Sequence, residues 1–177
     1  MLFNKKTIIF LILLIVAVRF FLYPPQNKNL HKGHNYSVIM PEGWEKKEAE
    51  NEVIVLSPET DFMTDKPLAV FSIYAKKVEG AALLLDIAFQ EFIESYRKSG
   101  WKVIKKGEIK IDEQITKWIL CQPLEEESPE LLLIFFNLDD FNNMTQIQYL
   151  AKDVDAFNKY RPTFEKFKDS IKFKKLF

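Results

Sequence analysis

The stretch Glu130-Leu-Leu-Leu-Ile-Phe-Phe-Asn-Leu138 carries six large apolar residues in succession, from Leu131 to Phe136. Successive side chains of a β-strand point to opposite faces of its sheet, so an uninterrupted apolar run gives a strand with two apolar faces. Such a strand is stable only where both faces are covered. The segment 130–138 is therefore predicted to be the central strand of a sheet that is covered on both sides.

The segments around this strand predict an antiparallel sheet. Residues 101–111 and 114–122 have the pattern of two strands joined by the short turn Asp112-Glu113. After the central strand, residues 139–143 form a second turn, which leads into a strand at 144–152. Connections this short join antiparallel neighbours.

The first half of the folded part also predicts strands. Tyr36, Val38 and Met40 alternate onto one face, as a half-buried strand requires. The charged segment 45–51 is predicted to be a turn, and Trp44 is predicted to close one end of the core. The predicted strands of this half are 35–40, 52–57 and 67–77.

Two segments have the helical period, in which apolar side chains recur every three or four residues. They are 80–99, which Gly100 is suited to end, and 153–173. Their apolar stripes are Leu85, Phe89, Phe92 and Tyr96 in the first, and Phe157, Tyr160, Phe164, Phe167 and Ile171 in the second. Pro162 interrupts the second stripe and predicts a short first turn, then a helix that restarts at or near the proline. The whole pattern predicts an α+β fold in which an antiparallel sheet is sandwiched between helices, an α/β/α arrangement.

The N-terminal 23 residues predict a membrane anchor that precedes this domain. The run 7–23 is almost entirely apolar, follows Lys5 and Lys6, and ends at Pro24-Pro25. If Arg19 extends its guanidinium to the headgroups, the run reaches the lower end of the length of a transmembrane helix, about 17 to 25 residues. The basic residues before the run favour an N-terminus inside and a domain outside. The residues predicted to form this anchor include Thr7, Ile8, Phe10, Leu14, Val18, Phe21 and Tyr23.

A cleaved signal peptide is the alternative interpretation of the same residues. Ala17 is followed by Val18 and Arg19, so the pair of small residues typical of a cleavage site is missing. The predicted division is a signal anchor or signal peptide at 1–23, a polar linker at 24–34 and one folded domain at 35–177. The domain is predicted to lie on the extracytoplasmic side of a single-pass anchor, or to be secreted if the segment is cleaved.

The charge balance disfavours nucleic acid as a partner. The chain has 25 basic and 25 acidic residues, and three basic ones, Lys5, Lys6 and Arg19, belong to the predicted anchor. The remainder holds 22 basic against 25 acidic residues. Binding to phosphates depends on clustered Lys and Arg, so a mildly acidic domain does not suit it.

The inventory of reactive side chains predicts no enzyme. Cys121, the one cysteine, lies in an apolar strand-like run, which predicts a buried thiol. His31 and His34 are the only histidines and precede the predicted domain, so a nucleophile in the domain would have no histidine base.

No metal set is evident either. His31 and His34 have no further ligand at a suitable spacing. Glu125 to Glu127 and Asp139-Asp140 lack the alternating spacing of a calcium loop. We predict a solvated linker, solvated acidic loops, and no metal or other cofactor.

Three segments together resemble a known family. They are Tyr36-Ser-Val-Ile-Met-Pro-Glu-Gly-Trp44, the helix before Gly100-Trp101, and the closing residues Phe164, Phe167 and Ser170-Ile-Lys-Phe173. On the basis of these segments, residues 35–173 resemble the PsbP-like domain. That family includes an extrinsic subunit of photosystem II, a Ran-binding nuclear-import factor, and many membrane-attached or periplasmic bacterial proteins. The resemblance implies the α/β/α fold and a noncatalytic role in binding proteins or, in the photosynthetic branch, in supporting a calcium and manganese site. No metal-binding motif of that branch is matched here.

Two hypotheses for the function follow. The first is a noncatalytic, membrane-anchored extracytoplasmic module that binds a protein of an envelope complex. The second is a periplasmic domain that binds a ligand or a metal such as calcium or manganese, through the acidic loops or a cleft beside the sheet.

Overall fold

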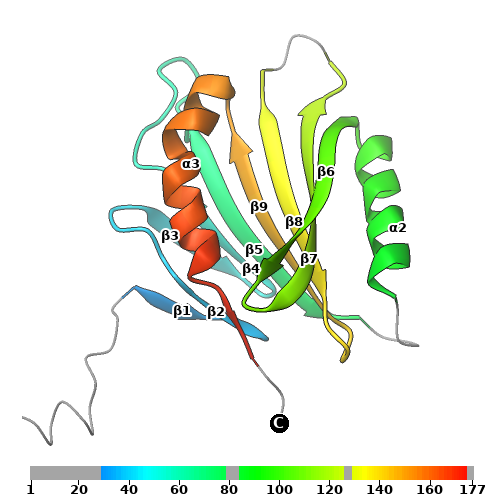
Figure 1. Ribbon diagram of the computed structural model, residues 1–177. Coiled ribbons are helices and arrows are strands. Elements are labelled where there is room, and N and C mark those ends of the chain that lie inside the picture. Colours follow the sequence, from blue (N-terminus) through cyan, green and yellow to red (C-terminus); the bar gives the residue numbers. More distant parts are fainter. Residues whose placement is uncertain (1–28, 79–83, 126–128, 175–177) are drawn as a thin grey trace, which may run out of the picture.

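The computed structural model describes residues 29–78, 84–125 and 129–174. The elements in chain order are β1 (Leu30–Lys32), β2 (Tyr36–Ile39), β3 (Glu45–Ala49), β4 (Glu52–Leu56), β5 (Ala69–Lys77), α2 (Leu85–Lys98), β6 (Trp101–Ile111), β7 (Gln114–Pro123), β8 (Leu131–Leu138), β9 (Asn143–Ala151), α3 (Val154–Asp169) and β10 (Lys172–Phe173). Within these residues the fold is α+β, with two antiparallel sheets and two helices (Figure 1).

The large sheet has seven strands in the order β3-β4-β5-β9-β8-β7-β6. All of its neighbouring strands are antiparallel. β8 lies between β9 and β7, and its residues 132–137 are all buried; five of the six are large and apolar, on alternating sides. The prediction of a strand at 130–138 with both faces covered is confirmed, although the middle strand of the sheet is β9, so β8 is internal rather than central.

The two helices cover opposite faces of the large sheet. Leu133 and Phe135 of β8 belong to the core beneath α3. Leu132, Ile134 and Phe136, the residues between and beside them, belong to the core beneath α2. Figure 1 shows α3 and α2 over different halves of the sheet, so each helix leaves part of its own face uncovered.

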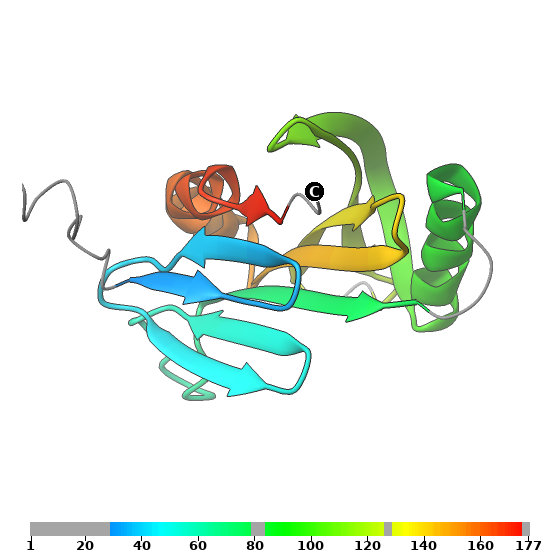
Figure 2. The same ribbon diagram turned by 90° about the horizontal axis from the view of Figure 1, so that it is seen from below.

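A smaller sheet, in the order β1-β2-β10, closes one end of the core under α3. Tyr36 and Val38 of β2 and Phe173 of β10 are buried in that core. Trp44, which follows β2, stacks on Phe71 with ring centroids 4.3 Å apart. Figure 2 shows β1 and β2 nearest the viewer, at the end of the molecule where the described chain begins. The prediction that Trp44 closes one end of the core agrees with these contacts.

β1 lies where the sequence predicted the polar linker. Leu30, His31 and Lys32 pair with Ile39, Val38 and Ser37 of β2. Three residues are too few to show an apolar alternation, and only the pairing with β2 makes them a strand. The folded part therefore begins before Asn35.

β3 replaces the charged turn predicted at 45–51. All five of its residues, Glu45–Ala49, are exposed, and β3 is an edge strand that pairs only with β4 among the described strands. With neither face buried, the sequence has no apolar alternation to reveal it. Charged side chains along an edge also discourage further strands from pairing there.

α3 is one continuous helix through Pro162, so the predicted break is wrong. The buried side chains Phe157 and Tyr160 precede the proline, and Phe164 and Phe167 follow it. Burying all four on one sheet outweighs the hydrogen bond that the proline removes. The helix ends at Asp169, earlier than the predicted 173, because Lys172 and Phe173 pair with β2.

The predicted anchor lies outside the described residues, as do residues 24–28 of the predicted linker. Within residues 29–78, 84–125 and 129–174, no helix is long and apolar enough to cross a membrane.

Candidate functional site

A groove of about 430 Å³ lies on the α3 face of the large sheet, between α3 and the β6–β7 hairpin. This is the half of that face that α3 does not cover. The apolar floor is formed by the sheet residues Ile109, Trp118, Leu120, Leu133 and Phe135, and Phe157 of α3 flanks it. The charged rim is formed by Lys105, Arg161, Glu165 and Lys168.

A β-bulge in β6 brings Lys105 to the groove. Val103 pairs with Cys121, but Lys105 pairs with Leu120, so Ile104 is an extra residue on the bulged strand. Cys121 belongs to the core beneath α2, whereas Leu120 lines the groove. Paired residues share a face, so the bulge places Val103 on the α2 side and Lys105 on the groove side. An unbroken alternation would have placed both on one side.

The central feature of the floor is the indole of Trp118. Trp118 is paired with Gly107 of β6. A Cβ on residue 107 would lie 2.8 Å from Cε2, Cζ2 and Nε1 of the indole. The ring therefore occupies the space above the glycine, and a glycine at 107 is what allows Trp118 to lie against the sheet.

The rim carries an excess of positive charge. Lys168 Nζ lies 2.6 Å from Glu165 Oε2, 3.1 Å from Asp169 Oδ1, and 5.6 Å from the ring centroid of Phe135. Burial alone would lower the pKa of Lys168, but its hydrogen bonds to Glu165 and Asp169 outweigh burial and raise the pKa. Lys168 is thus held charged beside an aromatic floor.

The other rim cations are less constrained. Arg161 Nε lies 3.8 Å from Glu165 Oε1, and the arginine side chain is 60% exposed. Lys105 completes the set from the sheet side. Three cations face one carboxylate among the lining residues, which leaves a charge of +2 at neutral pH. An apolar floor under a positive rim suits a segment that combines apolar and acidic side chains.

The groove is lined by apolar and charged side chains. Its lining residues include no histidine, cysteine, serine or threonine, and Lys168 is engaged by two carboxylates. A nucleophile with an adjacent base, which covalent catalysis requires, is therefore missing from these residues.

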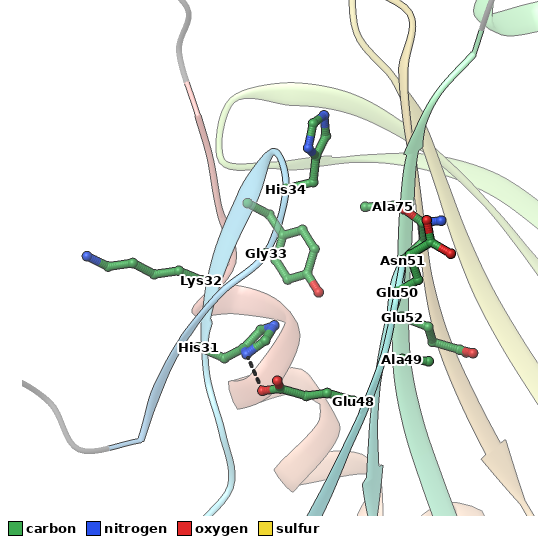
Figure 3. A pocket seen from close by; sticks show the side chains of 11 residues that line it. His31, Lys32, Gly33, His34, Glu48, Ala49, Glu50, Asn51, Glu52 and Ala75 are labelled. Atoms are coloured by element: carbon green, nitrogen blue, oxygen red, sulfur yellow. Dashed lines mark ion pairs between the residues drawn. The ribbon is translucent and has the colours of Figure 1, made fainter.

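A second cleft, of about 380 Å³, lies between the β1–β2 turn and the β3–β4 hairpin (Figure 3). His31 Nδ1 lies 3.2 Å from Glu48 Oε1. This contact links β1 and β3, which are edge strands of the two sheets. Figure 3 shows His34 on the β1–β2 turn, away from this pair. Burial lowers the pKa of His31, and the attraction of Glu48 only partly opposes this. The prediction that His31 belongs to a solvated linker is wrong, because its side chain is only 14% exposed.

The other residues singled out in the sequence have structural surroundings. Cys121 is buried, and burial raises the pKa of its thiol to about 11. Asp139 Oδ1 accepts hydrogen bonds from the backbone N–H groups of Phe141 and Asn143, so this carboxylate holds the β8–β9 turn.

In the described part of the chain, no group of three or more His, Cys, Asp and Glu residues is placed to hold a metal ion. Glu126 and Glu127, like the predicted anchor residues from Thr7 to Tyr23, lie outside that part.

Sequence reasoning missed the groove. Trp118, Leu120 and Ile109 were placed in the correct strands, but the bulge that sets their faces has no signature in the sequence. The one available signal was Gly107 in the middle of a predicted strand, since such a glycine often marks the close approach of another group.

The sequence matches no family model and no curated protein. Solved structures with a similar fold include the following three. Cyanobacterial PsbP (CyanoP) from Synechocystis sp. PCC 6803 has a TM-score of 0.58 at 11% identity, over 82% of this chain and 92% of that chain. A Pseudomonas aeruginosa protein, PA94, whose function is given as unknown and which is called a putative regulator, has a TM-score of 0.57 at 16% identity, over 83% of this chain and 97% of that chain. The Ran-binding protein Mog1p from Saccharomyces cerevisiae has a TM-score of 0.52 at 8% identity, over 78% of this chain and 90% of that chain. The chain therefore has the PsbP/Mog1-like fold, as the resemblance implied; at these identities the likeness concerns the fold alone.

Proposed function

We propose that this chain is a noncatalytic protein-binding module, which receives a segment of its partner in the groove between α3 and the β6–β7 hairpin. The observation that carries the proposal is the apolar floor centred on Trp118 beneath a rim of net positive charge. Aromatic residues in a half-open apolar site are typical of the energetic centre of a protein interface. The partner segment is expected to carry acidic and apolar side chains.

The fold neighbours agree with a binding role. Mog1p is by its name a Ran-binding protein, and it shares this fold. The groove residues offer no nucleophile with a base, which makes binding the better interpretation of the site.

The module is further proposed to work on the extracytoplasmic side of a membrane, held by residues 1–23. This part of the proposal rests on the apolar run from Thr7 to Tyr23 and on Lys5 and Lys6 before it. A full-length, membrane-bound chain whose domain is digested by protease added from outside would support it. A domain protected until the membrane is broken would contradict it.

Site-specific photocrosslinking tests the groove. A photoreactive amino acid at Leu120, in the floor, should form an adduct with one partner in cells, and the crosslinked peptide of that partner should be acidic and apolar. The matched control is Ile115, which lies on the same strand and is 48% exposed. It points to the opposite face because its neighbour Thr116 pairs with the groove residue Ile109.

Charge reversal on the rim separates specific docking from chance contact. Lys105→Glu with Arg161→Glu should abolish the Leu120 adduct, because the rim would then repel an acidic segment. Lys106→Glu is the control, since Lys106 pairs with Ile119 and so lies on the opposite face. Equal adducts from Leu120 and Ile115, or adducts that persist after reversal of the rim, would reject the groove as the site.

A further inference from the structure

The loop between β4 and β5 holds two large apolar side chains in solvent. Phe62 is 100% exposed and Met63 is 87% exposed, the two highest values among the large apolar side chains of the described residues. Most exposed apolar residues on a soluble surface are only partly exposed and scattered, whereas these two are adjacent at the tip of one loop. We call Phe62 and Met63 the apolar tip.

The loop beneath the tip is held by a buried carboxylate. Asp61 is 7% exposed. Its Oδ1 accepts hydrogen bonds from Met63 N (3.0 Å), Thr64 N (2.8 Å) and Thr64 Oγ1 (2.9 Å), and its Oδ2 forms an ion pair with Lys152 Nζ at the end of the sheet. The carboxylate therefore fixes the tip to a residue 91 positions away in the sequence.

Backbone hydrogen bonds close the loop on both sides of the tip. Asp61 N donates to Lys66 O at 2.7 Å, and Asp65 N donates to Asp61 O at 2.9 Å. Leu68 N donates to Glu59 O at 3.0 Å, and Glu59 Oε2 lies 2.5 Å from Lys159 Nζ of α3. A partner that buries the tip would not have to order this loop, so little of the binding free energy would be lost to conformational entropy.

A pocket of about 330 Å³ lies at the base of the same loop. Its apolar lining includes Leu68, Val70 and Leu150. Val70 pairs with Leu150, and both alternate with the α3-side residues Phe71 and Tyr149, so the pocket lies on the opposite face, at the margin of the core beneath α2 against which Leu150 packs. An apolar projection and an apolar recess thus lie side by side on one end of the molecule.

We propose that a second copy of this chain docks at this end of the molecule, with the apolar tip of each copy seated in the Val70–Leu150 pocket of the other. A two-fold axis brings the same patch of both copies together, and a patch that holds both a projection and a recess is complementary to itself. One contact made twice would bury both tips and fill both pockets.

The charges around the contact agree with a second copy. Lys66 and Lys152 line the pocket together with Asp61 and Glu130, so two cations face two carboxylates and neither copy repels the other. This balance gives no attraction to an anionic lipid surface, which basic residues would provide.

The position of the patch also leaves it accessible. Figure 1 shows the β4–β5 loop near the first turn of α3, while β1, where the described chain begins, lies at the other end of the molecule. The groove of the proposed function lies on the α3 face, so a dimer through the tip leaves it open and the two proposals can fail independently.

The size of the patch predicts a weak dimer. A buried aromatic side chain removes about 150 to 250 Å² from solvent. A standard interface buries about 800 Å² on each partner, and two tips with their pocket walls reach less than this. We therefore expect self-association that depends on concentration, with a dissociation constant weaker than about 1 μM.

Sedimentation velocity of the full chain in nonionic detergent, over about 1 to 300 μM, measures this association. Phe62→Ser with Met63→Ser should raise the dissociation constant at least tenfold. Both side chains are in solvent, so the variant should keep the wild-type melting temperature. The matched control is Phe141→Ser, which removes a 55% exposed phenylalanine from the β8–β9 turn and should leave the constant unchanged.

Disulfide trapping locates the contact independently of any association through other segments. Chains carrying Met63→Cys are mixed with chains carrying Val70→Cys and oxidised; the native Cys121 is buried. A mixed disulfide should form quickly between these chains. Its formation should be at least tenfold slower when Phe141→Cys replaces Met63→Cys. A chain that is monomeric throughout the range, or equal dimerisation of the tip variant, would overturn the proposal. Tip-dependent binding of a monomeric chain to phosphatidylcholine vesicles would overturn it as well.

Discussion

The indole of Trp118 lies against the backbone of Gly107, in the space that a side chain at 107 would occupy. Gly107→Ala should therefore force the indole outward and lower the free energy of unfolding by about 1 to 3 kcal/mol. Chemical denaturation monitored by circular dichroism measures the loss. In a Trp118→Leu background, Gly107→Ala should lower the free energy of unfolding by less than about 0.5 kcal/mol, because the clash with the indole is gone. An equal loss of stability in both backgrounds would show that the position of the Trp118 ring does not depend on the glycine.

Asp61 is predicted to be the main support of the β4–β5 loop. Asp61→Ala removes the acceptor of three hydrogen bonds and the partner of Lys152, and should lower the free energy of unfolding by about 2 to 4 kcal/mol. The control is Asp65→Asn: Asp65 is exposed and has a φ of 55°, a conformation that asparagine also tolerates. It should change stability by less than about 0.5 kcal/mol. Similar effects of the two variants in urea denaturation would contradict the role given to Asp61.

Pro162 is predicted to weaken the helix in which it lies. It is exposed within α3, and its ring leaves the carbonyl of Asn158 without the usual helical donor. Pro162→Ala should raise the free energy of unfolding by about 1 to 3 kcal/mol, after allowance for the more flexible unfolded chain. Lys166→Ala, on the exposed side of the same helix, should change it by less than about 0.5 kcal/mol. Destabilisation by Pro162→Ala, measured by thermal or urea unfolding, would mean that the proline has a favourable contact.

His31 should make stability depend on pH. Its pKa in the folded chain is below the ordinary value of 6.5, chiefly because of burial, so the unfolded chain binds more protons near that pH. The free energy of unfolding should fall as the pH drops through about 6.5 towards the lower folded-state pKa, and should level off below it.

The measurement is urea denaturation at a series of pH values between about 4.5 and 8. His31→Gln should reduce the slope in that window. His34→Gln is the control, since it replaces the other histidine of the chain and should leave the contribution of His31 in place. A slope that persists in His31→Gln would assign it to another group.

Cys121 should be unreactive in the folded chain. Its thiol has a pKa of about 11, against an ordinary value of 9.0, which means roughly a hundredfold less thiolate at pH 8. Ellman's reagent should therefore modify the native chain at least a hundredfold more slowly than the chain unfolded in guanidinium. Rapid modification of native protein would show that the core beneath α2 opens readily.

Much of the fold could be predicted because burial repeats along the chain. The hairpin of β6 and β7 ends within one residue of its predicted limits, and its turn residues Asp112 and Glu113 both have positive φ, as a tight hairpin turn requires. The apolar stripes that predicted α2 and α3 are the residues that pack on the sheet. Where one face of an element is buried, the local sequence is sufficient to predict that element, because apolar side chains occur on the buried face and polar ones on the exposed face.

Elements without a buried face could not be predicted in this way. β3 is exposed throughout and β1 has three residues, so neither shows a period. Both are strands because a partner strand supplies their hydrogen bonds. Pro162 gave the opposite error, since a local rule predicted a break that the packing of Phe157 and Phe164 overrides.

The sequence by itself determined the strands and helices that bury a face, their order, and the antiparallel connections between them. Tertiary structure alone decided where side chains from distant segments meet: Trp118 on Gly107 above the groove, and Asp61 with Lys152 beneath the apolar tip. The physical reason is that periodicity records only whether a residue is buried. Which residues become neighbours depends on a bulge, a helix that covers half of a face, and an ion pair across 91 positions, and none of these leaves a local pattern.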